Sequence, residues 1–262
     1  MIAAKTGARG PVWFLLDLLA APKPAQHYRT LEHRGRYRLF EQTVLAGLSS
    51  DGPLLLALEP DSGLWRDCHE QPNRWPGLFL VSRAGVSVLL EHLRGMLQVG
   101  FSGHYQGVLS YYNPQTASYF FDATDADELS SWLGPIEQLY WHGGTWADKA
   151  AGSLGWQQVL NPERAVSRLH WPAELSDKQQ GRLQECILER HAYRWSGATE
   201  TAYALTWKYL REGLALGFTQ GPVLDGWLRL RRCYPVAQVP AVLPGLTAQE
   251  RLDNLRRYWQ SL

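Results

Sequence analysis

The feature that most constrains how this chain folds is a change in the spacing of its apolar residues about two-thirds of the way along. Before that point, short apolar runs such as Val12–Leu16 and Leu54–Leu58 alternate with amphipathic segments. Beyond it, apolar residues recur only at intervals of three and four. Short apolar runs are typical of buried strands, whereas the longer spacing indicates helices that bury one face. The two parts of the chain therefore predict different architectures.

The first part predicts strands that alternate with helices, which indicates an α/β (α+β) lobe with a mixed sheet flanked by helices. Helices are expected at 22–33, where Pro22 and Pro24 suit a first turn, at 86–97 and at 125–133. Strands are expected at 12–16, 36–43, 54–58, 77–81, 107–112 and 136–141.

The second part predicts a smaller all-α lobe. Ser176 with Gln179, and Thr247 with Glu250, have the spacing of capping boxes that begin helices. Two more helices are expected between them: one carries a stripe from Tyr203 to Leu214, and the other begins at Gly221-Pro222. We place the boundary between the lobes after residue 166, so that the domains are 1–166 and 167–262.

Composition excludes several classes of protein. The chain has 262 residues, 45% of them hydrophobic, which is incompatible with intrinsic disorder. Its net charge of +1 argues against a nucleic-acid binder. No apolar run approaches the length of a membrane span, no signal-peptide pattern is visible at the start, and three cysteines are too few for a disulfide framework. We therefore expect a cytoplasmic protein without membrane insertion.

Signals for catalysis are weak. The sequence has no nucleophile elbow, phosphate-binding loop, dinucleotide-binding glycine pattern or zinc-protease motif. Asp17 ends an apolar strand, where α/β enzymes place catalytic groups, but a carboxylate that accepts hydrogen bonds from the next turn is the preferred interpretation. The acids Asp122, Asp125, Asp127 and Glu128 suit the start of a helix better than a cation site. We expect no catalytic residues, no metal and no cofactor.

The aromatic and arginine content is the strongest indication of binding. There are 12 Trp and 12 Tyr, and 21 of the 26 basic residues are Arg. Trp, Tyr and Arg are enriched at protein interfaces, where Lys is depleted. Trp207 and Trp227 lie in helical stripes and are expected in the core. Two groups are less well explained by burial and remain candidates for binding: Trp141, Trp146, Trp156 and Trp171 around the predicted lobe connection, and Arg229, Arg231 and Arg232 at a helix end.

Several motifs follow one another in a characteristic order along the first part of the chain. They are Trp13-Phe-Leu-Leu-Asp17, Arg38-Leu-Phe-Glu-Gln-Thr43, Gly52-Pro-Leu-Leu-Leu-Ala-Leu58, the Trp65 region, Leu89-Leu-Glu-His-Leu-Arg94 with Leu97, Leu109-Ser-Tyr-Tyr-Asn-Pro114 and Trp132-Leu-Gly-Pro135. In this order and spacing, they resemble the type VI secretion adaptor family, also called effector chaperones. The resemblance covers about residues 12–140, and the helical tail resembles the family's C-terminal lobe.

The resemblance implies a non-enzymatic adaptor that holds a secreted effector, often by its N-terminal segment, and promotes its loading onto the VgrG spike. Tyr111 and Tyr112, in the motif Leu109-Ser-Tyr-Tyr-Asn-Pro114, then join the Trp and Arg residues above as the predicted partner-binding set. The chain departs from the family pattern at Asn113 and Gln115, where the family carries charged residues, and at Gln42, where it carries a small one. The charges of the family either form an internal pair or contact a partner.

Two other functions remain open at this point. One is a carbohydrate- or cell-wall-binding module, which would need at least two coplanar, exposed rings among Trp65, Trp75, Trp141 and Trp146. The other is a hydrolase in which Asp17 acts as a base and faces a second titratable group. The sequence leaves the oligomeric state open.

Overall fold

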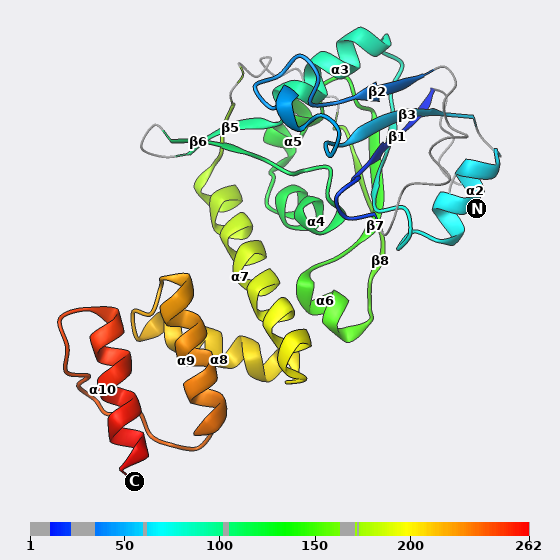
Figure 1. Cartoon of the computed structure of the whole chain (residues 1–262). Coiled ribbons are helices and arrows are strands. Elements are labelled where there is room, and N and C mark those ends of the chain that lie inside the picture. The colour runs from blue at the N-terminus through cyan, green and yellow to red at the C-terminus, as the bar shows by residue number, and fades with distance from the viewer. Residues whose placement is uncertain are drawn as a thin grey trace. The chain divides into compact units, whose positions relative to one another are not determined.

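The computed structural model describes residues 11–21, 35–59, 62–101, 105–162, 171 and 173–261. The chain divides into two compact units, Met1–Ile187 and Leu188–Leu262. The first contains two β-sheets and helices and the second is helical, so the predicted fold class is confirmed (Figure 1). The units divide inside helix α7 (Asp177–Thr199), further along the chain than the predicted boundary after residue 166.

A six-stranded antiparallel sheet is the centre of the first unit, with the strand order β2-β3-β1-β4-β7-β8. The predicted bounds of three strands, 12–16, 54–58 and 77–81, are confirmed. The strand expected at 36–43 ends at Arg38, and a turn follows it. The strands are β1 (Val12–Leu16), β2 (Arg36–Arg38), β3 (Leu54–Leu58), β4 (Gly77–Val81), β7 (Gln138–Gly143) and β8 (Gly155–Leu160).

A second sheet of three strands contains one parallel pair. Its order is β6-β5-β9, with β5 antiparallel to β6 and parallel to β9. The strand predicted at 107–112 is wrong beyond Val108, because residues 109–112 leave the ladder and turn towards the next helix. The strands are β5 (Gln98–Phe101), β6 (Tyr105–Val108) and β9 (Ala173–Glu174).

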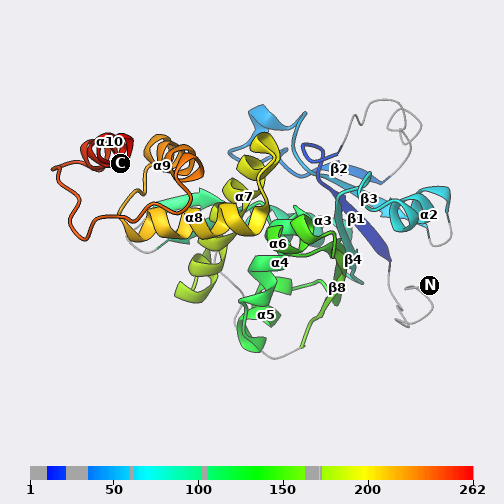
Figure 2. The same ribbon diagram turned by 90° about the horizontal axis from the view of Figure 1, so that it is seen from below.

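Helices cover both faces of the large sheet (Figures 1 and 2). The helix expected at 22–33 lies outside the described residues. The helices expected at 86–97 and 125–133 are confirmed to within two residues, whereas α2, α4 and α6 were not predicted. The helices of the first unit that precede α7 are α2 (Gly63–Glu70), α3 (Val86–Gly95), α4 (Pro114–Asp122), α5 (Ala126–Leu133) and α6 (Trp146–Ala151).

The alternation of side chains along the strands divides the first unit into two hydrophobic cores. Leu15 points to the face covered by α3, α4 and α5, while Phe14 and Leu16 point to the face covered by α2. All three side chains are fully buried, and burial of each stabilises the fold by about 1.5–3 kcal/mol. Central strand β1, which pairs with both β3 and β4, therefore links the two cores.

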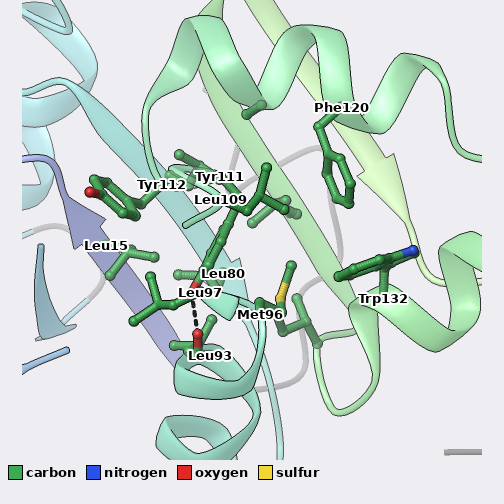
Figure 3. Packing of buried hydrophobic residues seen from close by; sticks show 14 of the residues in the cluster. Leu15, Leu80, Leu93, Met96, Leu97, Leu109, Tyr111, Tyr112, Phe120 and Trp132 are labelled. Carbon is green, nitrogen blue, oxygen red and sulfur yellow. Dashed lines mark hydrogen bonds between the residues drawn. The ribbon is translucent and has the colours of Figure 1, made fainter. Parts of the chain in front are cut away.

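The larger core is closed by the segment between β6 and α4. Leu109, Tyr111 and Tyr112 turn into it and pack with Leu93 and Leu97 of the α3 region (Figure 3). The Tyr111 hydroxyl donates a hydrogen bond to the Leu93 carbonyl oxygen at 2.8 Å. A buried phenol needs such a partner, because an unsatisfied hydroxyl costs about 1–3 kcal/mol.

The first turns of α7 are fastened to the α4–α5 region by polar contacts. The predicted Ser176–Gln179 capping box is present, and the Gln179 side-chain amide also donates to Thr124 Oγ1. Arg182 pairs with Asp122 at 3.0 Å, and Lys178 pairs with Asp125 at 2.9 Å. These two acids therefore lie opposite basic side chains. Across the described ranges, no three His, Cys, Asp or Glu side chains are placed to hold a metal ion.

The second unit packs α8, α9 and α10 around Trp227. This side chain is fully buried, and its indole N–H donates to the Tyr209 carbonyl oxygen at 2.7 Å. Gly213 allows the close approach, since a Cβ there would lie 2.3 Å from the indole ring. The predicted capping box of α10, Thr247 with Glu250, is confirmed. The helices are α8 (Tyr203–Ala215), α9 (Gly221–Cys233) and α10 (Ala248–Gln260).

Replacing Trp227 by Ala is expected to destabilise the second unit by about 3–5 kcal/mol, because it leaves a large cavity and removes the hydrogen bond to the Tyr209 carbonyl oxygen. Urea denaturation combined with hydrogen exchange of the α8 and α9 amides measures this. Tyr258→Ala is the matched control on a half-exposed ring, for which a change below about 0.5 kcal/mol is expected. A loss below about 1 kcal/mol for Trp227→Ala would contradict the assigned packing.

Candidate partner-binding site

Asp17 follows β1 and joins it to the start of α4. Its carboxylate is 4% exposed. Oδ1 accepts hydrogen bonds from the backbone amides of Leu19 and Ala20, at 3.1 and 3.2 Å. Oδ2 accepts one from the Asn113 side-chain amide at 2.8 Å. The preferred sequence interpretation, a carboxylate that accepts hydrogen bonds from the next turn, is confirmed, and these contacts give Asp17 a structural role.

Asn113 uses both ends of its side chain. Its Oδ1 caps α4 by accepting from the backbone amides of Gln115 and Thr116, while its Nδ2 donates to Asp17. Pro114 takes the first helical position, where its missing N–H costs nothing. An aspartate could cap the helix equally well but could not donate to a second carboxylate. The neutral amide at position 113 can therefore cap α4 and donate to the Asp17 carboxylate at the same time.

The neighbouring departure from the family pattern, Gln115, is buried, whereas Asn113 is half-buried. Of the two alternatives left open by the sequence, an internal contact fits the placement of both Asn113 and Gln115. Gln42 behaves differently: it is exposed, has a left-handed φ of 61°, and accepts a hydrogen bond from Arg94. The left-handed region is unfavourable for a residue with a Cβ, so a small residue would suit this position better.

Three predicted partner-binding residues are part of the large core. Tyr111 and Tyr112 are 1% and 6% exposed, and burial raises the pKa of both phenols. Trp141 on β7 is 3% exposed, and its indole N–H donates to Ser118 Oγ at 2.9 Å. Because their side chains are covered by the fold itself, these residues leave the partner-binding set. In each case the aromatic ring fills space between the sheet and its helices.

The other three predicted tryptophans are half-buried and lie in different places. Trp156 on β8 packs against the α2 side of the sheet, whereas Trp171 packs against the opposite core. Trp146 begins α6, where its backbone N–H donates to the Tyr119 hydroxyl and Lys149 lies over its ring at 4.9 Å. The two packed rings, Trp156 and Trp171, lie on opposite faces of the sheet, so the predicted set is not one binding platform.

None of the 12 tryptophans, all of which lie in the described part of the chain, has an exposed side chain. The carbohydrate hypothesis required at least two coplanar, exposed rings among Trp65, Trp75, Trp141 and Trp146. Trp65 and Trp141 are buried, and Trp75 packs against the α2-side core. The structure therefore does not supply the required pair of rings.

The three predicted arginines of α9 have two different roles. Arg231 is an internal link: it makes two hydrogen bonds to Glu212, each 3.0 Å long, and donates to the Tyr234 and Ala237 carbonyls. Its guanidinium also lies near the rings of Trp227 and Trp259. Arg229 and Arg232 are exposed and stay candidates for contact with a partner.

Sequence reasoning missed a cluster of aromatic rings centred on the half-buried His69. The imidazole lies 4.2 Å from the Trp65 ring, 4.5 Å from Phe79 and 5.2 Å from Trp156, measured between centroids. Nδ1 lies 2.8 Å from the Trp65 carbonyl oxygen, which requires a proton on Nδ1. Within the described part of the chain, buried Nε2 has no hydrogen-bond partner. Burial lowers the pKa of His69, partly offset by the bond to Trp65.

Comparison with known proteins gives one finding. The family described as "Domain of unknown function (DUF4123)" matches residues 12–131, just under half of the chain. The match begins at β1 and ends in α5, and it includes Asp17, Asn113 and most of both cores of the first unit. No curated protein and no solved structure matches the chain. None of the helices in the described ranges has the length and apolarity needed to cross a membrane.

Asn113→Asp tests the joint between β1 and α4. The variant places a second carboxylate next to Asp17, and we expect it to destabilise the first unit by about 2–4 kcal/mol at pH 7. One of two adjacent carboxylates takes up a proton more readily than an isolated one, so the loss should shrink as the pH falls towards about 4. Thermal and urea unfolding across this pH range measure both effects.

The charge-swapped pair Asp17→Asn with Asn113→Asp is the matched control. The amide then lies on position 17 and the carboxylate on position 113, so the hydrogen bond between them is retained with its direction reversed. Stability should recover by at least half relative to Asn113→Asp alone. Equal stability of the wild type and Asn113→Asp at pH 7 would show that the Asp17 contact has no structural role.

His69 predicts a pH dependence of the first unit. Because the folded state lowers its pKa, the neutral ring is favoured by folding. This contribution is present above the unfolded pKa of about 6.5 and is lost as the pH falls through the lower folded pKa. Between pH 7.5 and 5, unfolding midpoints should fall less in His69→Phe than in the wild type. The variant should keep part of the pH dependence of its unfolding midpoint, because burial also lowers the pKa values of His92 and His142. Identical slopes would contradict this assignment.

Proposed function

We propose that this chain is a non-catalytic adaptor of type VI secretion. In this role it binds an effector, by the effector's N-terminal segment, and promotes its loading onto the VgrG spike. The observation that carries the proposal is the family match over residues 12–131, which spans six of the seven ordered motifs and all but the last residues of the resemblance seen in the sequence. Loading of effectors takes place in the cytoplasm, and we place the protein there.

The role of the acid at the end of β1 supports a binding protein rather than an enzyme. Asp17 is the residue that a hydrolase would use as its base, yet its carboxylate accepts three hydrogen bonds from amide donors. The bond from Asn113 connects the end of β1 to the start of α4, and the two backbone bonds hold the turn after β1, so all three have a structural role. The motif residues of the family pattern therefore build the scaffold, and binding is left to the surface.

Four residues of the predicted partner-binding set remain candidates for contact with a partner, two in each unit. Arg229 and Arg232 are exposed on α9 of the second unit, and Trp146 and Trp156 are half-buried on the first. An adaptor must release its cargo, so a modest interface with a few anchors suits the task better than a large apolar one. Arginines on an exposed helix favour an acidic or carbonyl-rich partner surface.

The proposal is tested by defined pairs of proteins. The chain is co-expressed with the effector and the VgrG protein encoded beside it, and each pair is analysed by affinity purification and calorimetry. In the bacterium that carries the genes, deletion of the chain should abolish secretion of that effector and leave secretion of other effectors intact. Absence of binding to either protein, together with unchanged secretion, would refute the proposal.

Reversal of two charges on α9 tests where the partner binds. Arg229→Glu with Arg232→Glu should weaken binding of the effector or VgrG by at least about tenfold, since each lost charged contact at an interface costs on the order of 1 kcal/mol or more. Arg66→Glu with Arg74→Glu, on exposed positions of the first unit, changes the net charge equally and is the control. Equal affinities for the two double variants would remove α9 from the interface.

A further inference from the structure

The two outer strands of the large sheet differ in how well their free edges are protected. β2 is three residues long and carries Arg36 and Arg38. β8 is six residues long, Gly-Trp-Gln-Gln-Val-Leu, with no charge and no proline. Natural proteins usually protect an edge strand by charge, proline, a bulge or shortness, because unpaired backbone groups invite another strand. Within the described part of the chain, β8 pairs with β7 alone (Figure 1).

The hydrogen-bond pattern identifies which backbone groups of β8 are available. Opposed residues of an antiparallel pair alternate between bonded and non-bonded positions. The amide of Asn161 donates to the Glu137 carbonyl at 2.9 Å and continues the register of β7 with β8. The odd-numbered residues therefore bond to β7. Trp156, Gln158 and Leu160 direct their N–H and C=O groups away from the sheet.

These three residues are complementary to themselves. If a second β8 strand pairs antiparallel with the first about a two-fold axis at Gln158, each Trp156 lies opposite Leu160 of the second copy, and Gln158 lies opposite Gln158 of the second copy. Leu160 is 59% exposed in the single chain and would gain Trp156 of the second copy as its cross-strand neighbour on the same face. The register uses all three outward residues of each strand and makes about six backbone hydrogen bonds.

We propose that β8 is a self-association edge, through which two copies of this chain join their sheets into one continuous antiparallel sheet. The occupant is a second copy rather than an arbitrary strand, because the centred register pairs an apolar ring with an exposed apolar side chain and brings no like charges together. Strands of six residues bury a small area, below the roughly 1,200 Å² of stable interfaces, so the dimer is weak and concentration-dependent. This inference is independent of the proposed adaptor function.

Removal of one backbone donor tests the edge. Gln158→Pro deletes an outward N–H that the fold of the single chain does not use, whereas Gln158→Ala keeps it and removes only the side chain. Sedimentation velocity from about 10 to about 500 µM should show wild type and Gln158→Ala shifting from one chain mass towards two. Gln158→Pro should stay monomeric or associate at least about tenfold more weakly. A wild-type chain that is monomeric throughout, or a Gln158→Pro chain that dimerises equally well, would overturn the proposal.

A disulfide tests the register and does not depend on the proline variant folding. In a Cys233→Ser background, which removes the exposed cysteine, Gln158→Cys places two thiols on opposed residues about 5.5 Å apart at Cα, within disulfide range. Leu160→Cys is the control, because its two copies lie about 13 Å apart along the strands. Mild oxidation should cross-link the first variant and not the second, and the reverse pattern would overturn the register.

A different occupant of the same edge has its own outcome. A synthetic peptide with the β8 sequence serves as the probe for an extended segment. A chain that stays monomeric but binds this peptide, with no binding by Gln158→Pro, would assign the edge to an extended segment of another protein and would overturn the dimer.

Discussion

The antiparallel pairing of β1 with β3 and β4 is the interaction on which the rest of the first unit depends. Phe14, Leu15 and Leu16 are fully buried, and they contribute to the cores on both faces of the sheet. Neither α2 on one face nor α3 to α5 on the other could bury its apolar side without this strand between them. The hydrogen bonds of Asp17 then fix where the strand stops and where α4 begins. One strand and the acid that follows it thus position both layers.

Aromatic side chains in this protein act mainly as internal connectors. His69 and Trp156 bring α2 and β8 together over Phe79, Trp141 and Phe121 join β7 to α4, and Trp227 and Trp259 fill the second unit. Arg231 shows the same pattern for a charged residue, since Glu212 and three rings surround its guanidinium. A high content of Trp, Tyr and Arg is therefore compatible with a binding function but does not locate it. The three arginines are alike in the sequence, and only the exposure of their side chains in the structure distinguishes Arg229 and Arg232, which can contact a partner, from the internal Arg231.

The two edge strands of the large sheet, β2 and β8, differ in how well they are protected against pairing with another strand. Arg38 is held by the Ser49 carbonyl and adds charge to the β2 edge. At β8 the outward backbone groups are flanked by glutamines and an exposed leucine. In the proposed self-association, β8 of a second copy covers these groups. Trp156 of β8 enters both proposals, whereas Arg229 and Arg232 of α9 bear on the adaptor function alone, so substitutions on α9 test that function separately.

The sequence by itself determined the elements whose signal is local. Five-residue apolar runs define β1, β3 and β4 to the residue, capping boxes define the starts of α7 and α10, and a helical stripe defines α3, since in each case neighbouring residues supply the whole pattern. β8 was missed because its sequence, Gly-Trp-Gln-Gln-Val-Leu, does not alternate regularly between apolar and polar residues. It is a strand because it pairs with β7. Asn113-Pro114 was interpreted as the end of a strand, whereas proline equally well begins a helix. Only the tertiary structure decided which rings are buried and which carboxylate Asn113 meets, because burial and hydrogen bonding across 96 residues of chain depend on packing that no local pattern encodes.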